Sequence, residues 1–388
     1  MAPPPLELID DVTAEIFLRL PPDEPEHLFR ASLVCKPWLR VISDPDFRRR
    51  YRAFHRTPPL LGFLQRRQVL EGPPAPRLTT TTTVPPLIPN PPFRDADALD
   101  CHHGRVLLRA DAADAGDGDW CFMVWDPLTG EKHRLPEVDI DILVYSAAVV
   151  CAVRGCDHLD CHGGPFRVVF VATDDVDRLV KACVYSSETG VWSTPVSLGD
   201  DCEVYAQHKQ DAISIQSYHL PYVQPRRGAV IGDETYFTLR WANAIVRYNW
   251  TNNCISMINP PSQDVYYIAL MEMEDGALGF VCIEGSSLYL WSRKVSSEAA
   301  AEWVKCRVIK LEGLIHVADQ DGDEALVVGS AEGVGVIFVT TGSGLFTLEL
   351  KSGRVRKVDE PEVYFSILPY MSFYTPDHST LPSLVRTH

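Results

Sequence analysis

The sequence predicts two regions of different fold class, a small all-α module near the N-terminus and a large all-β domain after it. Three observations support this division. Apolar residues recur at helical spacing over residues 6–56. Prolines then accumulate, with 18 of the 30 lying within residues 1–92. From about residue 93 onward, short β-branched and aromatic runs alternate with Gly, Asn, Asp and Ser clusters, which is typical of strands joined by tight turns.

The first predicted helix lies directly before the Pro21-Pro22 pair. Its apolar residues repeat at helical spacing and are Ile9, Val12, Ile16, Phe17 and Leu20. Asp10 and Asp11 stand at its start, where negative charge suits the helix dipole. Because proline disrupts a helix interior, we expect this helix to end at Pro21.

Three further helical segments follow. The second is expected to start at Asp23, with Glu26 three residues later in an arrangement similar to a capping box, and to end at Pro37. A short third segment contains Trp38. Asp44-Pro45 begins a fourth helix. One face of that helix consists of Phe47, Tyr51 and Phe54.

The predicted helical module is small and apolar, and its second half is basic. A unit of about fifty residues is marginally stable alone and commonly needs a partner. Residues 30–67 contain ten Arg or Lys against Asp44 and Asp46, a net charge of +8, although the whole chain carries -16. We therefore expect the module to dock onto another protein with an acidic surface.

The helical module carries three short motifs in order. They are Leu8-Ile9-Asp10-Asp11-Val12 with Leu20-Pro21, then Val34-Cys35-Lys36-Pro37-Trp38, and then Ser43-Asp44-Pro45-Asp46-Phe47. On these motifs the module resembles an F-box, which in its family binds Skp1 and thereby a cullin-RING ubiquitin ligase. The start departs from the family pattern, since many members open with Leu-Pro where this chain has Leu8-Ile9.

The F-box resemblance implies a set of residues that contact a Skp1-like protein. They are Ile16, Leu20, Pro21, Leu28, Leu33, Val34, Cys35 and Trp38. The aliphatic members would anchor the contact, and Trp38 would be an aromatic hot spot. The alternative is an unrelated helical cap whose apolar side chains pack only against one another.

The β domain contains a repeated pattern, an apolar strand that ends in a large residue and is followed by a polar turn. These large residues lie 43 to 63 positions apart and are Trp125, Tyr185, Tyr248, Trp291 and Leu350. Another candidate strand precedes each of them. A period near fifty residues predicts four-stranded propeller blades. Five blades are visible in the sequence. The region resembles the divergent propeller-like domains that follow the F-box in plant F-box proteins. The alternative fold is a pair of β-sandwiches.

A sixth blade is expected from the two ends of the β domain. Residues 60–64 and 364–368 are both apolar, and their pairing would close the ring and hide its edges. The predicted organisation is therefore an F-box module at 6–56, a Pro/Thr-rich linker with a possible closing strand at 57–92, and a propeller-like substrate-binding domain at 93–376. The fold class is a small all-α module plus a β-propeller of about six blades.

One group of residues contains the donor types that zinc prefers. Cys156, His158, Cys161 and His162 crowd into seven positions, with Cys151 shortly before them. The spacing lacks two well-separated ligand pairs, so a loop without metal is the alternative reading. We predict no cofactor and leave open whether this group binds a metal.

Composition excludes several classes of function. The net charge of -16 and the pI near 5.2 argue against nucleic acid or an anionic membrane as partner. No stretch reaches about 18 uninterrupted apolar residues. The eleven scattered cysteines indicate reduced thiols rather than a secreted disulfide scaffold. We expect a protein of the nucleus, the cytoplasm or both.

The resemblance implies a function that needs no catalytic residue. The chain is predicted to be the substrate-recognition adaptor of an SCF-type (Skp1-cullin-F-box) E3 ubiquitin ligase, with a protein substrate that the sequence does not identify. Ubiquitin transfer would belong to partner subunits, while this chain would raise the effective concentration of the substrate. The sequence contains no phosphate-binding, dinucleotide-binding or hydrolase-elbow motif. The alternative is a β-propeller enzyme or metal-binding protein with a helical cap.

Overall fold

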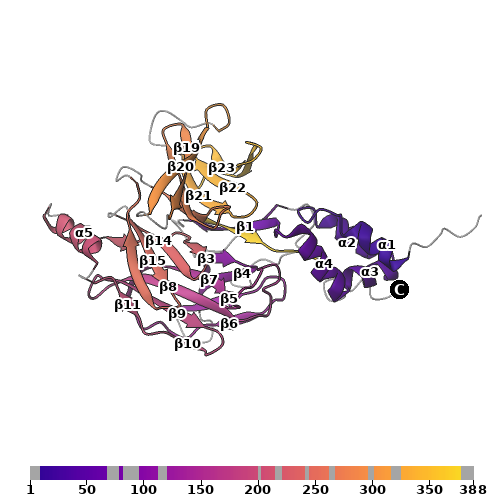
Figure 1. Cartoon of the computed structure of the whole chain (residues 1–388), viewed down its shortest axis with the longest axis horizontal. Coiled ribbons are helices and arrows are strands. Elements are labelled where there is room, and N and C mark those ends of the chain that lie inside the picture. The colour runs from indigo at the N-terminus through magenta and orange to yellow at the C-terminus, as the bar shows by residue number, and fades with distance from the viewer. Residues whose placement is uncertain are drawn as a thin grey trace, which may run out of the picture.

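The computed structural model divides the chain into a projecting helical module and a ring of β-sheets (Figure 1). It describes residues 9–67, 78–81, 96–111, 120–199, 202–214, 221–240, 244–261, 267–295, 301–315 and 325–376. The proline-rich stretches of the predicted linker, and the last residues of the threonine run, lie outside the described residues. The helical module occupies one end of the molecule, and the strands that meet it are β1 (Leu60–Arg67) and β25 (Tyr364–Met371).

Four helices form the module as predicted, but their ends differ from the prediction, and the first helix already ends at Phe17, before Pro21. They are α1 (Asp10–Phe17), α2 (Glu26–Val34), α3 (Lys36–Ser43) and α4 (Pro45–His55). The second helix begins at Glu26 rather than at Asp23, because Pro25 occupies the N-cap position without a side-chain cap. Pro37 does not end this helix. It lies in the first turn of α3, where a missing backbone N–H costs no helical hydrogen bond.

The start of α4 confirms the predicted cap. The Asp44 side chain accepts hydrogen bonds from the backbone N–H groups of Asp46 at 2.7 Å and Phe47 at 3.3 Å. Pro45 follows in the first turn, where it is tolerated. This cap directs Phe47 and Tyr51 into the module core, and the Tyr51 hydroxyl donates to the Leu20 carbonyl at 2.9 Å.

The core of the helical module is shared with the propeller. Its buried residues are Ala14, Phe17, Leu18, Leu28, Ala31, Val41, Ile42, Phe47, Tyr51 and, from the C-terminal segment, Phe373. In the other direction, Phe29 of α2 packs against the propeller cluster that contains Leu61 and Leu368. The helical module and the propeller are therefore packed against each other through apolar side chains, and they are not merely joined by a linker.

The β domain is a six-bladed propeller, as predicted. The first blade consists of β3 (Ala96–His102), β4 (Arg105–Asp111), β5 (Trp120–Trp125) and β6 (Lys132–Arg134). The second consists of β7 (Ile142–Cys151), β8 (Phe166–Asp174), β9 (Val180–Ser186), β10 (Val191–Trp192) and β11 (Val196–Ser197). The third consists of β12 (Tyr222–Val223), β13 (Ala229–Ile231), β14 (Glu234–Arg240), β15 (Ala244–Asn249) and β16 (Cys254–Ile258). The next two are β17 (Ala269–Glu272), β18 (Leu278–Glu284), β19 (Ser287–Lys294) and β20 (Glu302–Lys310); and β21 (Leu326–Ala331), β22 (Val336–Thr341), β23 (Gly344–Glu349) and β24 (Val355–Asp359). The repeated large residues lie in or directly after β5, β9, β15, β19 and β23, one per blade.

The sixth sheet closes the ring with both ends of the β domain. Strand β1 pairs antiparallel with β25, placing Leu64 opposite Leu368, and β2 (Leu78–Thr80) pairs with β1. The predicted closure is thus confirmed, and part of the predicted linker belongs to this blade. Gly62 is required in β1, because a Cβ there would meet the Thr79 carbonyl oxygen at 2.7 Å.

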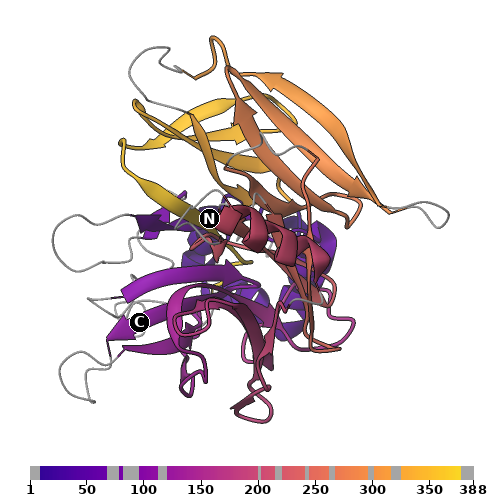
Figure 2. The ribbon, with the colours of Figure 1, turned by 90° about the vertical axis from the view of Figure 1, so that its left-hand side faces the viewer.

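One helix interrupts the β domain and was not predicted. It is α5 (Glu203–Ser214), between the second and third blades, and it lies on the side of the propeller away from the helical module (Figures 1 and 2). Its sequence combines an N-terminal Glu with good helix formers, and Tyr205 is buried against the second and third blades. No helix in the described residues is long and apolar enough to cross a membrane.

Candidate functional site

Besides Phe54 on α4, the helical module exposes large apolar side chains at α1 and α2. Val12 and Ile16 lie four residues apart on α1, which places them on one face, and Ile9 is the extended N-cap residue of the same helix. Leu33 and Val34 are exposed at the end of α2, and Val34 is 63% exposed. We call these five residues the docking surface. Both helices pack on α3, and exposed apolar clusters of this kind commonly mark contact sites.

The structure separates the eight predicted contact residues by burial. Ile16, Leu33, Val34 and Cys35 are exposed, while Leu20, Pro21 and Trp38 are half-buried. The ring of Trp38 packs edge-on against Phe17 at 5.2 Å, which holds it beside α1.

Leu28 differs from the other seven predicted residues. It is 1% exposed and lies in the module core with Ala31, so it supports the docking surface from beneath instead of forming part of it. Sequence reasoning also left Ile9 and Val12 out of the contact set. Their spacing relative to Ile16 was the available signal.

Much of the predicted basic surface is neutralised within the chain. Arg40 pairs with Asp10 at 2.8 Å, and Arg50 pairs with Glu15. Arg49 also pairs with Asp46 at 2.8 Å, and Arg52 pairs with Asp160 at 2.5 Å. The expectation of an acidic partner surface came from charge counts alone. These ion pairs weaken it, because several of the arginines are already paired with carboxylates of the same chain. Apolar contact is the stronger feature of the module.

A loop of the second blade, residues 152–165 between β7 and β8, attaches the propeller to the helical module. Leu159 packs against the module core, and its neighbour Asp160 forms the ion pair with Arg52. His162 lies between Asp126 Oδ2 at 2.7 Å and Ser372 Oγ at 3.0 Å. Burial opposes ionisation of Asp126, but the hydrogen bond to His162 holds the pKa of that carboxyl below its ordinary value.

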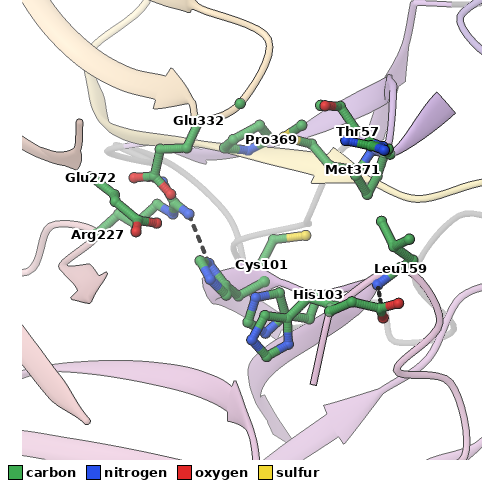
Figure 3. Close-up of a pocket in the computed structure, with 15 residues that line it drawn as sticks. Thr57, Cys101, His103, Leu159, Arg227, Glu272, Glu332, Pro369 and Met371 are labelled. Atoms are coloured by element: carbon green, nitrogen blue, oxygen red, sulfur yellow. Dashed lines mark hydrogen bonds and ion pairs between the residues drawn. The ribbon is translucent and has the colours of Figure 1, made fainter. Parts of the chain in front are cut away.

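A cavity of about 330 Å³ lies where this loop, residues 56–58 and the inner strands of the propeller meet (Figure 3). Arg227 points into it with Glu272 and Glu332 nearby. The Arg227 guanidinium donates to His102 Nδ1 at 3.1 Å, to Asp100 Oδ1 at 3.3 Å and to Glu332 Oε1 at 3.3 Å. One buried arginine therefore links the first, third and fifth blades.

The ionisable groups around the cavity are engaged with one another. Burial would lower the pKa of Arg227, but Glu332 and Asp100 outweigh it and raise the value. Burial and the neighbouring cations lower the pKa of His103 to about 3 and that of His102 well below its ordinary value. These shifts favour the neutral imidazoles and the charged guanidinium, so the cavity contains a structural ion-pair network around Arg227.

The predicted zinc-donor group is only partly brought together. The side chains of Cys151, Cys156, His158 and Cys161 have their donor atoms within 4.8 Å of one another. His162, which the sequence placed in this group, is instead held by Asp126 and Ser372. Cys151 takes its place because the end of β7 lies beside the loop. The three cysteines of this group are free of disulfide bonds.

The fold and surface define a class of protein, a six-bladed propeller with an F-box-type helical module. Comparison with known families agrees on both regions. Residues 97–378 match the family described as "F-box protein AT5G49610-like, beta-propeller", and residues 5–50 match the F-box domain. The chain therefore belongs to the family of F-box proteins with an AT5G49610-like β-propeller.

Individual relatives are distant. F-box protein At5g03970 of Arabidopsis thaliana is 25% identical over 298 residues, which cover 73% of this chain and 64% of that protein. The chain thus matches slightly less than two thirds of the length of this relative. Solved structures that align include virginiamycin B lyase from Staphylococcus aureus (12% identity, 68% of each chain, TM-score 0.34) and KlAtg21 in complex with the coiled-coil of AgAtg16 (9% identity, 72% of each chain, TM-score 0.37). Neither structural match bears on function.

Proposed function

We propose that this chain is the substrate-recognition adaptor of an SCF-type E3 ubiquitin ligase. The helical module binds a Skp1-type protein and through it a cullin, while the propeller holds a protein substrate. The chain itself contributes no catalytic group, since its role is to bring the substrate near the ubiquitin-transferring subunits. We place it in the nucleus, the cytoplasm or both, which the localisation of a fluorescently tagged chain would test.

The observation that carries the proposal is the docking surface. The N-cap residue Ile9 and the α1 residues Val12 and Ile16 remain in solvent, although the same helix buries Phe17 and Ala14 in the module core. This amphipathic division leaves one apolar face without a partner in the described chain. The F-box match lies over these helices, and that domain indicates a Skp1-type partner.

The test is capture of a purified Skp1-type protein by the full chain. Ile16→Glu combined with Val34→Glu should abolish capture, because charges would be buried in an apolar contact. Phe54→Glu is the matched control: Phe54 is also an exposed apolar residue of the module, but it lies on α4 outside the docking surface and should leave capture unchanged. Equal binding by the double variant and the wild type would refute the proposal.

Substrate binding needs a separate measurement, because the propeller can bind its target whether or not Skp1 is present. The propeller should retain substrate in the Ile16→Glu, Val34→Glu variant while losing Skp1 and the cullin. Quantitative comparison of proteins captured by this variant and by the wild type would reveal candidates. If every captured protein disappears with Skp1, the propeller is not the substrate-binding part.

A further inference from the structure

The four donors around the second-blade loop have the arrangement of a metal site. A tetrahedral zinc ion with Zn–S bonds of about 2.3 Å and a Zn–N bond of about 2.0 Å separates its ligand atoms by about 3.5 to 3.8 Å. Cys156 Sγ lies 3.8 Å from Cys161 Sγ, and Cys161 Sγ lies 3.6 Å from His158 Nδ1. Cys151 completes the group, within 4.8 Å of each of the others.

From this geometry we propose that Cys151, Cys156, His158 and Cys161 bind one structural zinc ion. A set of three thiolates and one imidazole is among the common closed sites for zinc, and its soft sulfur donors disfavour magnesium and calcium. The separation of 3.8 Å between the two sulfur atoms is too long for a disulfide, whose S–S bond is about 2.05 Å.

The surroundings of the four donors resemble the outer shell of a zinc site. The backbone N–H of His158 donates to Cys156 Sγ at 3.4 Å, a contact that favours the thiolate form. The His158 ring stacks on His103 at 3.8 Å with an interplanar angle of 7°, which fixes its orientation. His158 also has a φ of +57°, an uncommon conformation for a residue other than glycine.

Arg105 supplies a positive charge next to the site. Three thiolates and one Zn²⁺ carry a net charge of about -1, which a neighbouring cation stabilises. Arg105 is 3% exposed and donates to the carbonyls of Cys161 and, at 2.6 Å, Gly164. Its Nη1 atom is buried without a hydrogen-bond partner among the described residues. A buried guanidinium bound to carbonyl oxygens suits an anionic metal centre.

The zinc ion would stabilise the contact between propeller and helical module. Leu159 and Asp160, which contact the module, lie between the ligands His158 and Cys161. Holding both ligands on one ion would keep the two contacting residues in position. This inference does not rest on the proposed ligase function, since a metal-bound loop would orient the module in any protein of this architecture.

The first test measures metal in the full chain, purified under reducing conditions, by elemental analysis. We expect about one zinc per chain, and its replacement by Co²⁺ should produce the intense visible bands of a tetrahedral cobalt site with thiolate ligands. Absence of bound zinc together with absence of the cobalt bands after reconstitution would overturn the proposal. Iron in place of zinc, or a disulfide between these cysteines in the intact mass, would overturn it as well.

Variants then assign the ligands. Cys156→Ser and Cys161→Ser should each lower the bound zinc at least about tenfold. Cys254→Ser is the matched control, because Cys254 is an exposed free cysteine of another blade and should leave the zinc content unchanged. His162→Gln should also retain zinc. If His162→Gln lost zinc while Cys156→Ser and Cys161→Ser retained it, the proposed set of four ligands would be refuted. If a cysteine variant does not fold, the cobalt bands of the wild-type chain still test whether the zinc site exists.

Discussion

The helical module and the propeller differ in how they treat large apolar side chains. The propeller buries many of its aromatic residues completely, as Phe170, Phe280 and Phe338 show with 0% exposure, although Trp120 and Tyr267 are exposed. Its exposed apolar residues include Val176, which lies in the turn between two strands. The module instead exposes three aliphatic residues at α1, the N-cap residue Ile9 and the helical residues Val12 and Ile16. The two regions of one chain therefore differ in where they expose large apolar side chains. This difference shows that the burial of apolar residues must be judged for each region separately.

The polar interactions of the two regions differ in the same way. The propeller contains a buried ion-pair network around Arg227, which is shielded from water and joins three blades. The ion pairs of the module, such as Arg40 with Asp10, lie at the surface. Surface pairs contribute little to stability, whereas removing one member of a buried network leaves uncompensated charge. The following predictions test this contrast from the largest expected effect to the smallest.

The largest effect is expected from Arg227→Met in the propeller. Asp100 and Glu332 would remain buried without their counter-ion, so the free energy of unfolding should fall by about 3 to 5 kcal/mol. Chemical denaturation of the full chain measures this loss. Arg354→Met is the control, because Arg354 is exposed and its loss should change stability by less than about 0.5 kcal/mol. Similar values for both variants would remove the distinction between buried and surface charges.

The next prediction compares a buried residue of the helical module with an exposed one. Leu28→Ala should destabilise the module by about 2 to 5 kcal/mol, because it removes a fully buried side chain. Ile16→Ala should change stability by less than about 0.5 kcal/mol but weaken binding to the Skp1-type partner. Denaturation and binding assays on both variants separate these roles. If Ile16→Ala destabilised the module as much as Leu28→Ala, the docking surface would be part of the core.

A smaller effect is expected at the start of α4. Asp44→Ala removes the acceptor for the backbone N–H groups of Asp46 and Phe47 and should cost about 1 kcal/mol. Asp44→Asn keeps a capping oxygen and should lose much less. Thermal denaturation of the two variants compares them directly, and equal losses would show that charge rather than capping is responsible.

The smallest effect concerns pH at the junction between the regions. Because the folded-state pKa of Asp126 lies below its ordinary value, its contribution is present above that ordinary value and disappears as the pH falls through the folded-state pKa. Asp126→Asn should therefore be less stable than the wild type near neutral pH, by under about 1 kcal/mol, and this gap should close in acid. Denaturation across an acidic pH series measures it. A gap that widens in acid would contradict the assigned direction.

Several features could be predicted because local chemistry determines them. The Asp44 cap depends on residues adjacent in sequence, and the blades carry their own strand and turn signals. The closing pair of β1 and β25 was found because both segments are apolar and an open propeller edge is unfavourable. In contrast, α5 carries little apolar periodicity, and its buried anchor Tyr205 shows its role only once two blades surround it.

The candidate sites show where prediction from sequence ends. Motif order placed the predicted contact residues on α1, α2 and the segments that follow them, yet it did not separate buried Leu28 from exposed Ile16. The cysteine and histidine group was visible in sequence, but which four donors meet depends on how β7 and its loop fold together. The Arg227 network gave no sequence signal, since its members are more than one hundred residues apart.

The sequence by itself determined the helical and β regions, the blade period and the F-box motifs, because each of these depends on spacing and turn chemistry within short segments. Tertiary structure alone decided which apolar side chains remain exposed, which arginines are already paired and which thiols share a site. The physical reason is that burial, charge pairing and coordination depend on distances between segments, and folding brings those segments together from remote parts of the chain.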